Sequence, residues 1–116
     1  MKYVYPAIFH PEDEGGYSIW FPDLPSGATQ GEDWLDGIEY AEDCLALILY
    51  MMEKDGKQIP PATEPNAVKT EGGEFVTLIA ADTEFYYKWF AEQAARKEAR
   101  RAARVAKKKP ELAPVS

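Results

Sequence analysis

The stretch from Phe21 to Gly31, FPDLPSGATQG, constrains the fold of this chain more than any other segment. It holds two prolines and two glycines within eleven residues. Proline lacks a backbone donor and fixes φ, and glycine weakens both helices and strands, so this stretch cannot lie inside a regular element. Asp23, between the prolines, suits a turn in which its side chain bonds its own backbone. The sequence therefore predicts a corner between a pair of strands and a helix, with Thr29-Gln30 as a very short third strand.

Two strands are expected before this corner. Residues 2–9 are rich in aromatic and β-branched side chains, and residues 17–21 alternate between the two faces of a strand. The pair Gly15-Gly16 suits the turn between them, because glycine readily takes a positive φ. Pro6 lies within the first strand and predicts an edge position, since a proline cannot donate a hydrogen bond to a neighbouring strand.

A long amphipathic helix is expected after the corner. Asp33 can cap its first turn with its carboxylate. Apolar side chains then recur with the 3.6-residue period of a helix packed on a sheet, at Trp34, Ile38, Ala41, Leu45, Leu49 and Met52. Gly37 predicts close contact between helix and sheet, and Gly56 is placed to end the helix in the left-handed conformation.

The second half of the chain predicts one more strand and one more helix. Residues 58–73 contain three prolines and no period, so they form a connector. Residues 75–79 are strongly apolar and predict a central strand. Asp82 can cap a final helix, which Pro110 ends. We therefore expect an α+β fold with the order β-β-β-α-β and a C-terminal helix. Its parts are a domain of residues 1–81, a basic helix of residues 82–109 and a tail of residues 110–116.

The charge of the chain is divided unevenly. Residues 1–87 hold 17 acidic and four basic side chains, whereas residues 88–109 hold nine basic and two acidic ones. Such a division predicts two different partners, or contact of one part with the other. The final helix starts with Phe85, Trp89 and Phe90, which should dock on an apolar surface. Beyond them its basic side chains are expected on all sides, where they remain solvated or contact phosphates or an acidic surface. The candidate contacts are Trp89, Arg96, Arg100, Arg101 and Arg104.

Residues with catalytic chemistry are sparse. His10 is the single histidine and Cys44 the single cysteine, so a histidine-based metal site or triad lacks members. We expect a structural histidine and a buried, unreactive thiol. Carboxylates that could hold Mg²⁺ occur in the hairpin turn and on the solvated face of the helix, where a rigid octahedral site is not expected: Glu12, Asp13, Glu14, Glu39, Glu42 and Asp43. The sequence predicts no catalytic residue, no cofactor and no bound metal.

The chain is expected to be a cytoplasmic protein. It has 116 residues and no apolar run close to the ~18 residues that a membrane span needs. Its N-terminus has no secretory hydrophobic segment, and a single cysteine fits a reducing compartment.

The order of elements and the corner resemble the HicB antitoxin family over about residues 1–90. The resemblance rests on short segments along the chain: Tyr5-Pro6-Ala7, Gly15-Gly16-Tyr17-Ser18, residues 21–25 with 29–31, the helix of residues 33–52, Asp55-Gly56, Ile59-Pro60 and residues 75–79. It implies a fold similar to a reduced ribonuclease H that lacks the catalytic carboxylates, and a role in neutralising a small basic HicA toxin that cleaves RNA. Two departures are Ser26-Gly27-Ala28, where relatives carry Gly-Cys, and a C-terminal helix in place of a ribbon-helix-helix or helix-turn-helix segment.

The leading hypothesis is a non-enzymatic antitoxin that binds its HicA-like toxin through the acidic body and forms a homo-oligomer, a dimer or a tetramer. The predicted toxin contacts are Tyr17, Trp20, Asp23, Glu39 and Asp43. Two alternatives remain. One is a nucleic-acid-binding regulator that contacts DNA through the basic helix, and the other is a degenerate nuclease with a carboxylate metal site.

Overall fold

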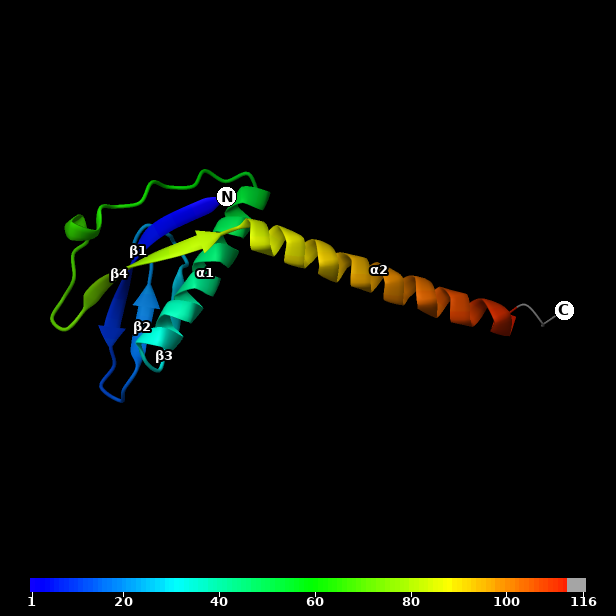
Figure 1. Cartoon of the computed structure of the whole chain (residues 1–116), viewed down its shortest axis with the longest axis horizontal. Coiled ribbons are helices and arrows are strands. Elements are labelled where there is room, and N and C mark those ends of the chain that lie inside the picture. Colours follow the sequence, from blue (N-terminus) through cyan, green and yellow to red (C-terminus); the bar gives the residue numbers. More distant parts are fainter. Residues whose placement is uncertain (113–116) are drawn as a thin grey trace. The chain divides into compact units, whose positions relative to one another are not determined.

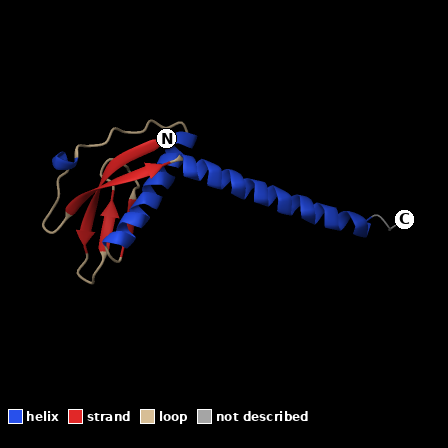
Figure 2. Cartoon of the chain, in the orientation of Figure 1, coloured by secondary structure: helices blue, strands red, loops and turns tan. Residues whose placement is uncertain are grey.

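A computed structural model describes residues 1–112 of the chain, and the side chains of residues 1–104. It confirms the α+β class and the predicted order of elements (Figures 1 and 2). The chain divides into two units, residues 1–84 and the part that starts at Phe85. The elements are β1 (Lys2–Pro11), β2 (Tyr17–Trp20), β3 (Ala28–Gly31), α1 (Trp34–Lys54), the 3₁₀ turn η1 (Pro65–Ala67), β4 (Phe75–Asp82) and α2 (Glu84–Leu112).

The four strands form one antiparallel sheet in the order β3-β2-β1-β4. The prediction that the fourth strand is central is wrong, because β4 pairs only with β1 and lies at an edge. The apolar residues of β4 are divided between the buried and the exposed face of this edge strand. Ile79 and Ala81 are buried on one side, whereas Leu78 and Ala80, which alternate with them, are exposed.

The edge position predicted from Pro6 is also wrong, since β1 lies between β2 and β4. The register explains how a proline fits there. β1 pairs with β4 from Lys2 to Phe9, but it pairs with β2 only from Ile8 to Pro11. Pro6 therefore lies in a stretch where β1 has a neighbouring strand on one side only, and its missing donor is tolerated.

Helix α1 packs on one face of the sheet, and the core lies between them. The helix contributes Ala41, Leu45 and Leu49, all with no exposed area, and the sheet contributes Phe9 and Ile19 among others. The predicted 3.6-residue stripe is thus confirmed at these three helix residues, but not at its start, because Trp34 is exposed.

The ends of α1 and its predicted glycine contact are also confirmed. The Asp33 carboxylate accepts a hydrogen bond from the Asp36 N–H at 2.8 Å, and Gly56 follows the helix with φ +69°. Gly37 allows a close approach to the sheet, since a Cβ there would lie 3.0 Å from side-chain atoms of Phe9 and Ile19.

The predicted corner is a compact turn that holds the long connector. The Phe21 N–H donates to the Gly27 carbonyl at 2.9 Å, and Phe21 is buried. The sequence suggested that the Asp23 carboxylate bonds the backbone of its own turn, and this prediction is wrong. It accepts from the N–H (2.9 Å) and the hydroxyl (2.5 Å) of Thr63 in the connector. The Tyr5 hydroxyl donates to the Pro60 carbonyl, a second tie to the same connector.

Helix α2 begins close to its predicted start, where Asp82 Oδ1 accepts a hydrogen bond from the Glu84 N–H at 3.1 Å. The predicted stop at Pro110 is wrong, because α2 continues to Leu112. The rest of the predicted tail, residues 113–116, lies outside the described residues.

Between positions 96 and 104 of α2, the basic side chains do not surround the helix. At 3.6 residues per turn, the five between positions 96 and 104 fall within an arc of about 140°. All are exposed: Arg96, Lys97, Arg100, Arg101 and Arg104.

Candidate functional site

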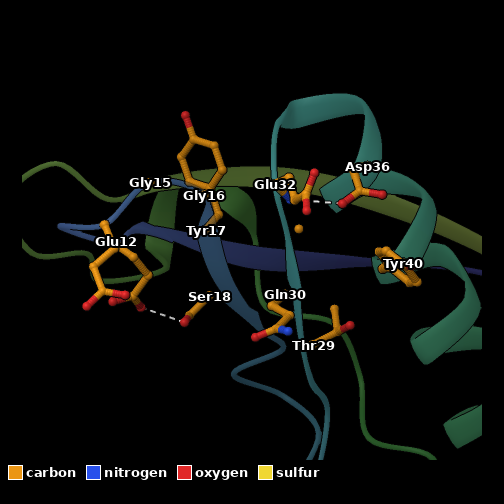
Figure 3. Close-up of a pocket in the computed structure, with 12 residues that line it drawn as sticks. Glu12, Gly15, Gly16, Tyr17, Ser18, Thr29, Gln30, Glu32, Asp36 and Tyr40 are labelled. Carbon is orange, nitrogen blue, oxygen red and sulfur yellow. Dashed lines mark hydrogen bonds between the residues drawn. The ribbon is translucent and has the colours of Figure 1, made fainter.

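An open depression of about 860 Å³ lies between the β1–β2 turn, the edge strand β3 and the first turns of α1 (Figure 3). Four carboxylates line it, those of Glu12, Glu14, Glu32 and Asp36. Lysine and arginine are absent from the residues that line it. The depression therefore carries negative charge without a neutralising partner in its own lining.

Local backbone geometry fixes the acidic side chains around the depression. The turn closes with the Gly15 N–H donating to the Glu12 carbonyl and the Glu12 N–H donating to the Gly16 carbonyl, both at 3.0 Å. Gly15 and Gly16 both have positive φ, as predicted. The Ser18 hydroxyl then donates to the Glu12 carboxylate at 2.5 Å (Figure 3). Two strands and a glycine turn thus orient Glu12 toward β2.

The opposite wall of the depression is the start of α1. The Asp36 carboxylate accepts a hydrogen bond from the Glu32 N–H at 2.8 Å (Figure 3). Further along α1, Asp36, Glu39, Tyr40 and Asp43 are spaced i, i+3, i+4 and i+7, so they share one face of the helix. Negative charge therefore extends from the depression along α1. We call this region the acidic surface, defined by Glu12, Glu14, Glu32, Asp36, Glu39 and Asp43.

Aromatic side chains border the acidic surface. The Trp34 indole N–H donates to the Tyr17 hydroxyl at 2.8 Å, which links α1 to β2. Trp34 is nevertheless 65% exposed, Leu35 is 69% exposed and Tyr40 is 52% exposed. Large exposed side chains of this kind next to charged groups are typical of protein-binding sites.

Sequence reasoning did not find Trp34 and Leu35 as surface residues, because both fit the apolar period of α1. The signal that was available is their position. They occupy the first turn, where a helix has only begun to lie over the sheet, so the apolar period alone does not predict burial.

The predicted toxin contacts fall into two groups. Tyr17, Glu39 and Asp43 belong to the acidic surface or line its depression. Trp20 lies on the opposite face of β2 from Tyr17, with its ring 6.1 Å from that of His10. Asp23 is bonded to the connector. Tyr17 therefore lines the depression, whereas Glu39 and Asp43 lie on the face of α1 that continues from Asp36, and contact of any of the five with a toxin stays a prediction.

Other reactive groups have structural partners. His10 Nδ1 lies 2.8 Å from the Glu74 carboxylate, which is 7% exposed. The Cys44 thiol lies 3.7 Å from the Ala28 carbonyl, and burial raises its pKa, which makes it a poorer nucleophile. Among the described residues, no three histidine, cysteine or acidic side chains are grouped so that they could hold a metal ion.

Neither α1 nor α2, over the residues described, is both long and apolar enough to cross a bilayer. The acidic surface is the candidate site that the described side chains define best, and its carboxylates can attract cationic groups.

Comparison with known proteins gives a family for this fold. Residues 5–107 match the HicB-like antitoxins of bacterial toxin–antitoxin systems. The chain belongs to the HicB-like antitoxin family. Over 56 residues this family member is 38% identical to Antitoxin HicB 1 of Photorhabdus laumondii and to Antitoxin HicB of Escherichia coli K12. That match covers 48% of the chain, but only 36% and 41% of these relatives, respectively.

Solved structures support the HicB-like fold. A toxin–antitoxin complex from Streptococcus pneumoniae contains a similar chain, with a TM-score of 0.68 at 20% identity over 94% of this chain and 100% of that one. The N-terminal domain of Burkholderia pseudomallei antitoxin HicB aligns with a TM-score of 0.59 at 19% identity, over 69% of this chain and 99% of that one. A HicA3–HicB3 toxin–antitoxin complex gives 0.57 at 21% identity, with the same coverage.

Proposed function

We propose that this HicB-like chain is an antitoxin that binds and neutralises a small, basic, RNA-cleaving toxin of the HicA type. The binding role is assigned to residues 1–81, and the basic helix of residues 82–109 is treated as a separate part. The observation that carries the proposal is the acidic surface, with six carboxylates and no basic residue in the lining of its depression.

Charge supports this assignment. A protein that cleaves RNA must present positive side chains to phosphate groups. An antitoxin that covers such a surface therefore gains from carboxylates in a complementary arrangement, which steer the encounter and fix the orientation of the partner. Residues 1–81 contain 15 acidic and four basic side chains, so the field around them attracts a cation-rich partner.

The exposed apolar side chains beside the acidic residues support a stable complex, in addition to the rapid association that the charges favour. Tryptophan is among the residues whose truncation costs most at protein interfaces. Trp34 is held by its hydrogen bond to Tyr17, so little of its side-chain freedom would be lost on binding.

The proposed role requires no catalysis by the chain itself, and it places the protein in the cytoplasm with the RNA that its toxin cleaves. The absence of a grouped ligand set for metal within the described residues is consistent with a binding protein. Purified chain should leave RNA and DNA intact in the presence of Mg²⁺ or Mn²⁺.

Titration of toxin activity tests the proposal. The probe is the small basic protein encoded by the neighbouring reading frame, assayed for cleavage of a labelled RNA with increasing amounts of the full chain. Cleavage should be abolished near one chain per toxin. Undiminished cleavage at a tenfold excess of the chain would refute the proposal, and so would a neighbouring frame whose product is not small and basic.

A further inference from the structure

One face of helix α2 changes from aromatic to basic along its length. Phe85 and Trp89 are one turn apart and remain 64% and 41% exposed. Arg96 and Arg100 follow Trp89 at i+7 and i+11, so helical geometry places them on the same face as Trp89. We call Phe85, Trp89, Arg96 and Arg100 the α2 contact face.

We propose that the α2 contact face joins two copies of this chain in an antiparallel helix pair. Phe85 and Trp89 of one copy pack against the same two residues of the other. Arg96 and Arg100 of each copy then lie against the acidic body, residues 1–84, of the other copy.

The direction of pairing follows from charge. In a parallel pair, the basic stretches of the two helices would lie side by side and repel each other. In an antiparallel pair that crosses near Tyr87, the basic stretches point away from each other. Residues 88–104 carry six basic and two acidic side chains, so the difference in repulsion between the two arrangements is large.

The second half of the contact follows from chain connectivity. The body of each copy joins the N-terminal end of its own α2 at Glu84. An antiparallel partner helix therefore runs its C-terminal half past Glu84, toward the end of α2 that carries this body. The body holds 17 acidic and four basic side chains, which makes it a complementary surface for Arg96 and Arg100.

A partner of this kind also suits the order of residues along the face. The first turns meet another helix and need apolar area, which aromatic side chains supply. The later turns meet a negatively charged surface and need arginine. A second copy of the chain offers both surfaces at once.

The mass of the full chain in solution tests the pairing. Sedimentation at micromolar concentration should give a dimer for the wild type and a monomer for the Phe85→Ala/Trp89→Ala variant. Leu78→Ala removes an apolar side chain that is 54% exposed on the body, and it should leave the dimer unchanged. The charge-reversal variant Arg96→Glu/Arg100→Glu should raise the dimer dissociation constant at least tenfold at low salt. A monomeric wild type, or dissociation by Leu78→Ala, would overturn the proposal.

Distance measurement between spin labels tests the direction. Ala103→Cys in a Cys44→Ser background carries one label per chain. An antiparallel pair centred on Tyr87 separates the two labels by about 50 Å, from a rise of 1.5 Å per residue. A parallel pair would bring the helix axes within about 10 Å at this position and contradict the proposal.

Nucleic acid is the other class of partner for a basic helix, and the same variants separate it. In a gel shift with a random 30-base-pair duplex, the wild type should bind no more tightly than the Arg96→Glu/Arg100→Glu variant. Salt-sensitive DNA binding by a monomeric wild type, lost in that variant, would assign the face to phosphates instead.

Discussion

Gly31 and Gly37 place the backbones of β3 and α1 in direct contact. A Cβ on Gly31 would lie 2.3 Å from the Gly37 Cα and 2.5 Å from its nitrogen. No side chain fits at that distance, so only glycine at position 31 lets the helix start this close to the edge strand. The contact fixes the positions of Glu32 and Asp36, which line the acidic depression.

Substitution of Gly31 by alanine should therefore destabilise the protein and its site together. The Gly31→Ala variant must move α1 away from β3, and overpacking of this kind costs about 2–3 kcal/mol in the free energy of unfolding. Urea denaturation of the full chain measures the loss. Gly72→Ala is the matched control, because its added Cβ meets no atom within 4 Å, and it should change stability by less than about 0.5 kcal/mol. Equal stability of the two variants would show that β3 and α1 do not touch as described.

Glu74, which follows the connector, should contribute pH-dependent stability to the fold. Its pKa is lowered from the usual 4.5, chiefly by a hydrogen bond from the Glu71 N–H and also by its bond with His10. A carboxyl group with a lowered pKa in the folded state binds its proton less readily there than in the unfolded chain. Its contribution is therefore present above pH 4.5 and is lost as the pH falls through the folded-state pKa.

Glu74→Gln tests this contribution, because it removes the titrating group and keeps the size of the side chain. Between pH 6 and pH 3 the variant should lose less stability than the wild type, as measured by thermal unfolding at each pH. If the stability of the two proteins changes with pH in the same way, the pKa of Glu74 does not differ between the folded and unfolded states.

Asp23 should act as a tie between the corner and the connector. The Asp23 carboxylate accepts two hydrogen bonds from Thr63, one on each oxygen. In Asp23→Asn one of these oxygens becomes an NH₂ group and the negative charge is lost, so we expect a loss of about 1 kcal/mol in the free energy of unfolding. A second readout comes from Tyr5, whose pKa is raised by burial and, to a smaller extent, by the Asp23 carboxylate. In the variant the Tyr5 pKa should fall part of the way toward 10, as followed by its ultraviolet titration. Weaker toxin binding without either change would instead make Asp23 a contact residue.

Much of the fold could be predicted because local patterns decide it. The period of α1, the Asp33 cap and the glycine pair in the hairpin each follow from the physics of a few neighbouring residues. The order of strands did not follow in the same way. Pro6 suggested an edge, but the proline is tolerated because β2 pairs with β1 only from Ile8 to Pro11, which is a property of the register. The apolar run of β4 suggested a centre, but the order of strands places β4 at an edge.

The candidate site was predicted in part, for a similar reason. Glu39 and Asp43 could be found because helical spacing places them on the solvated face of α1. The convergence of the hairpin acids with Glu32 and Asp36 depends on the close contact of Gly31 with Gly37, which no local pattern shows. Asp23 was misplaced because turn chemistry predicts bonds within the turn, whereas the connector supplies its partner from 40 residues away.

The proposed docking of a basic toxin on the acidic surface can be tested by the rate at which the two proteins associate. The full chain is compared with a variant of the acidic surface, Glu14→Gln/Glu32→Gln/Glu39→Gln. The control variant, Asp55→Asn/Glu64→Gln/Glu71→Gln, removes the same number of negative charges from exposed positions elsewhere on the body.

Stopped-flow association with the toxin from the neighbouring reading frame is measured at low salt and at 0.15 M salt, where the screening length is ~8 Å. We expect the wild type to associate with the toxin more slowly at the higher salt concentration. At low salt, the acidic-surface variant should associate on the order of tenfold more slowly than the wild type, and the control variant within about twofold of it. A wild-type rate that does not change with salt, or equal slowing by both variants, would contradict the claim that the toxin docks on this surface.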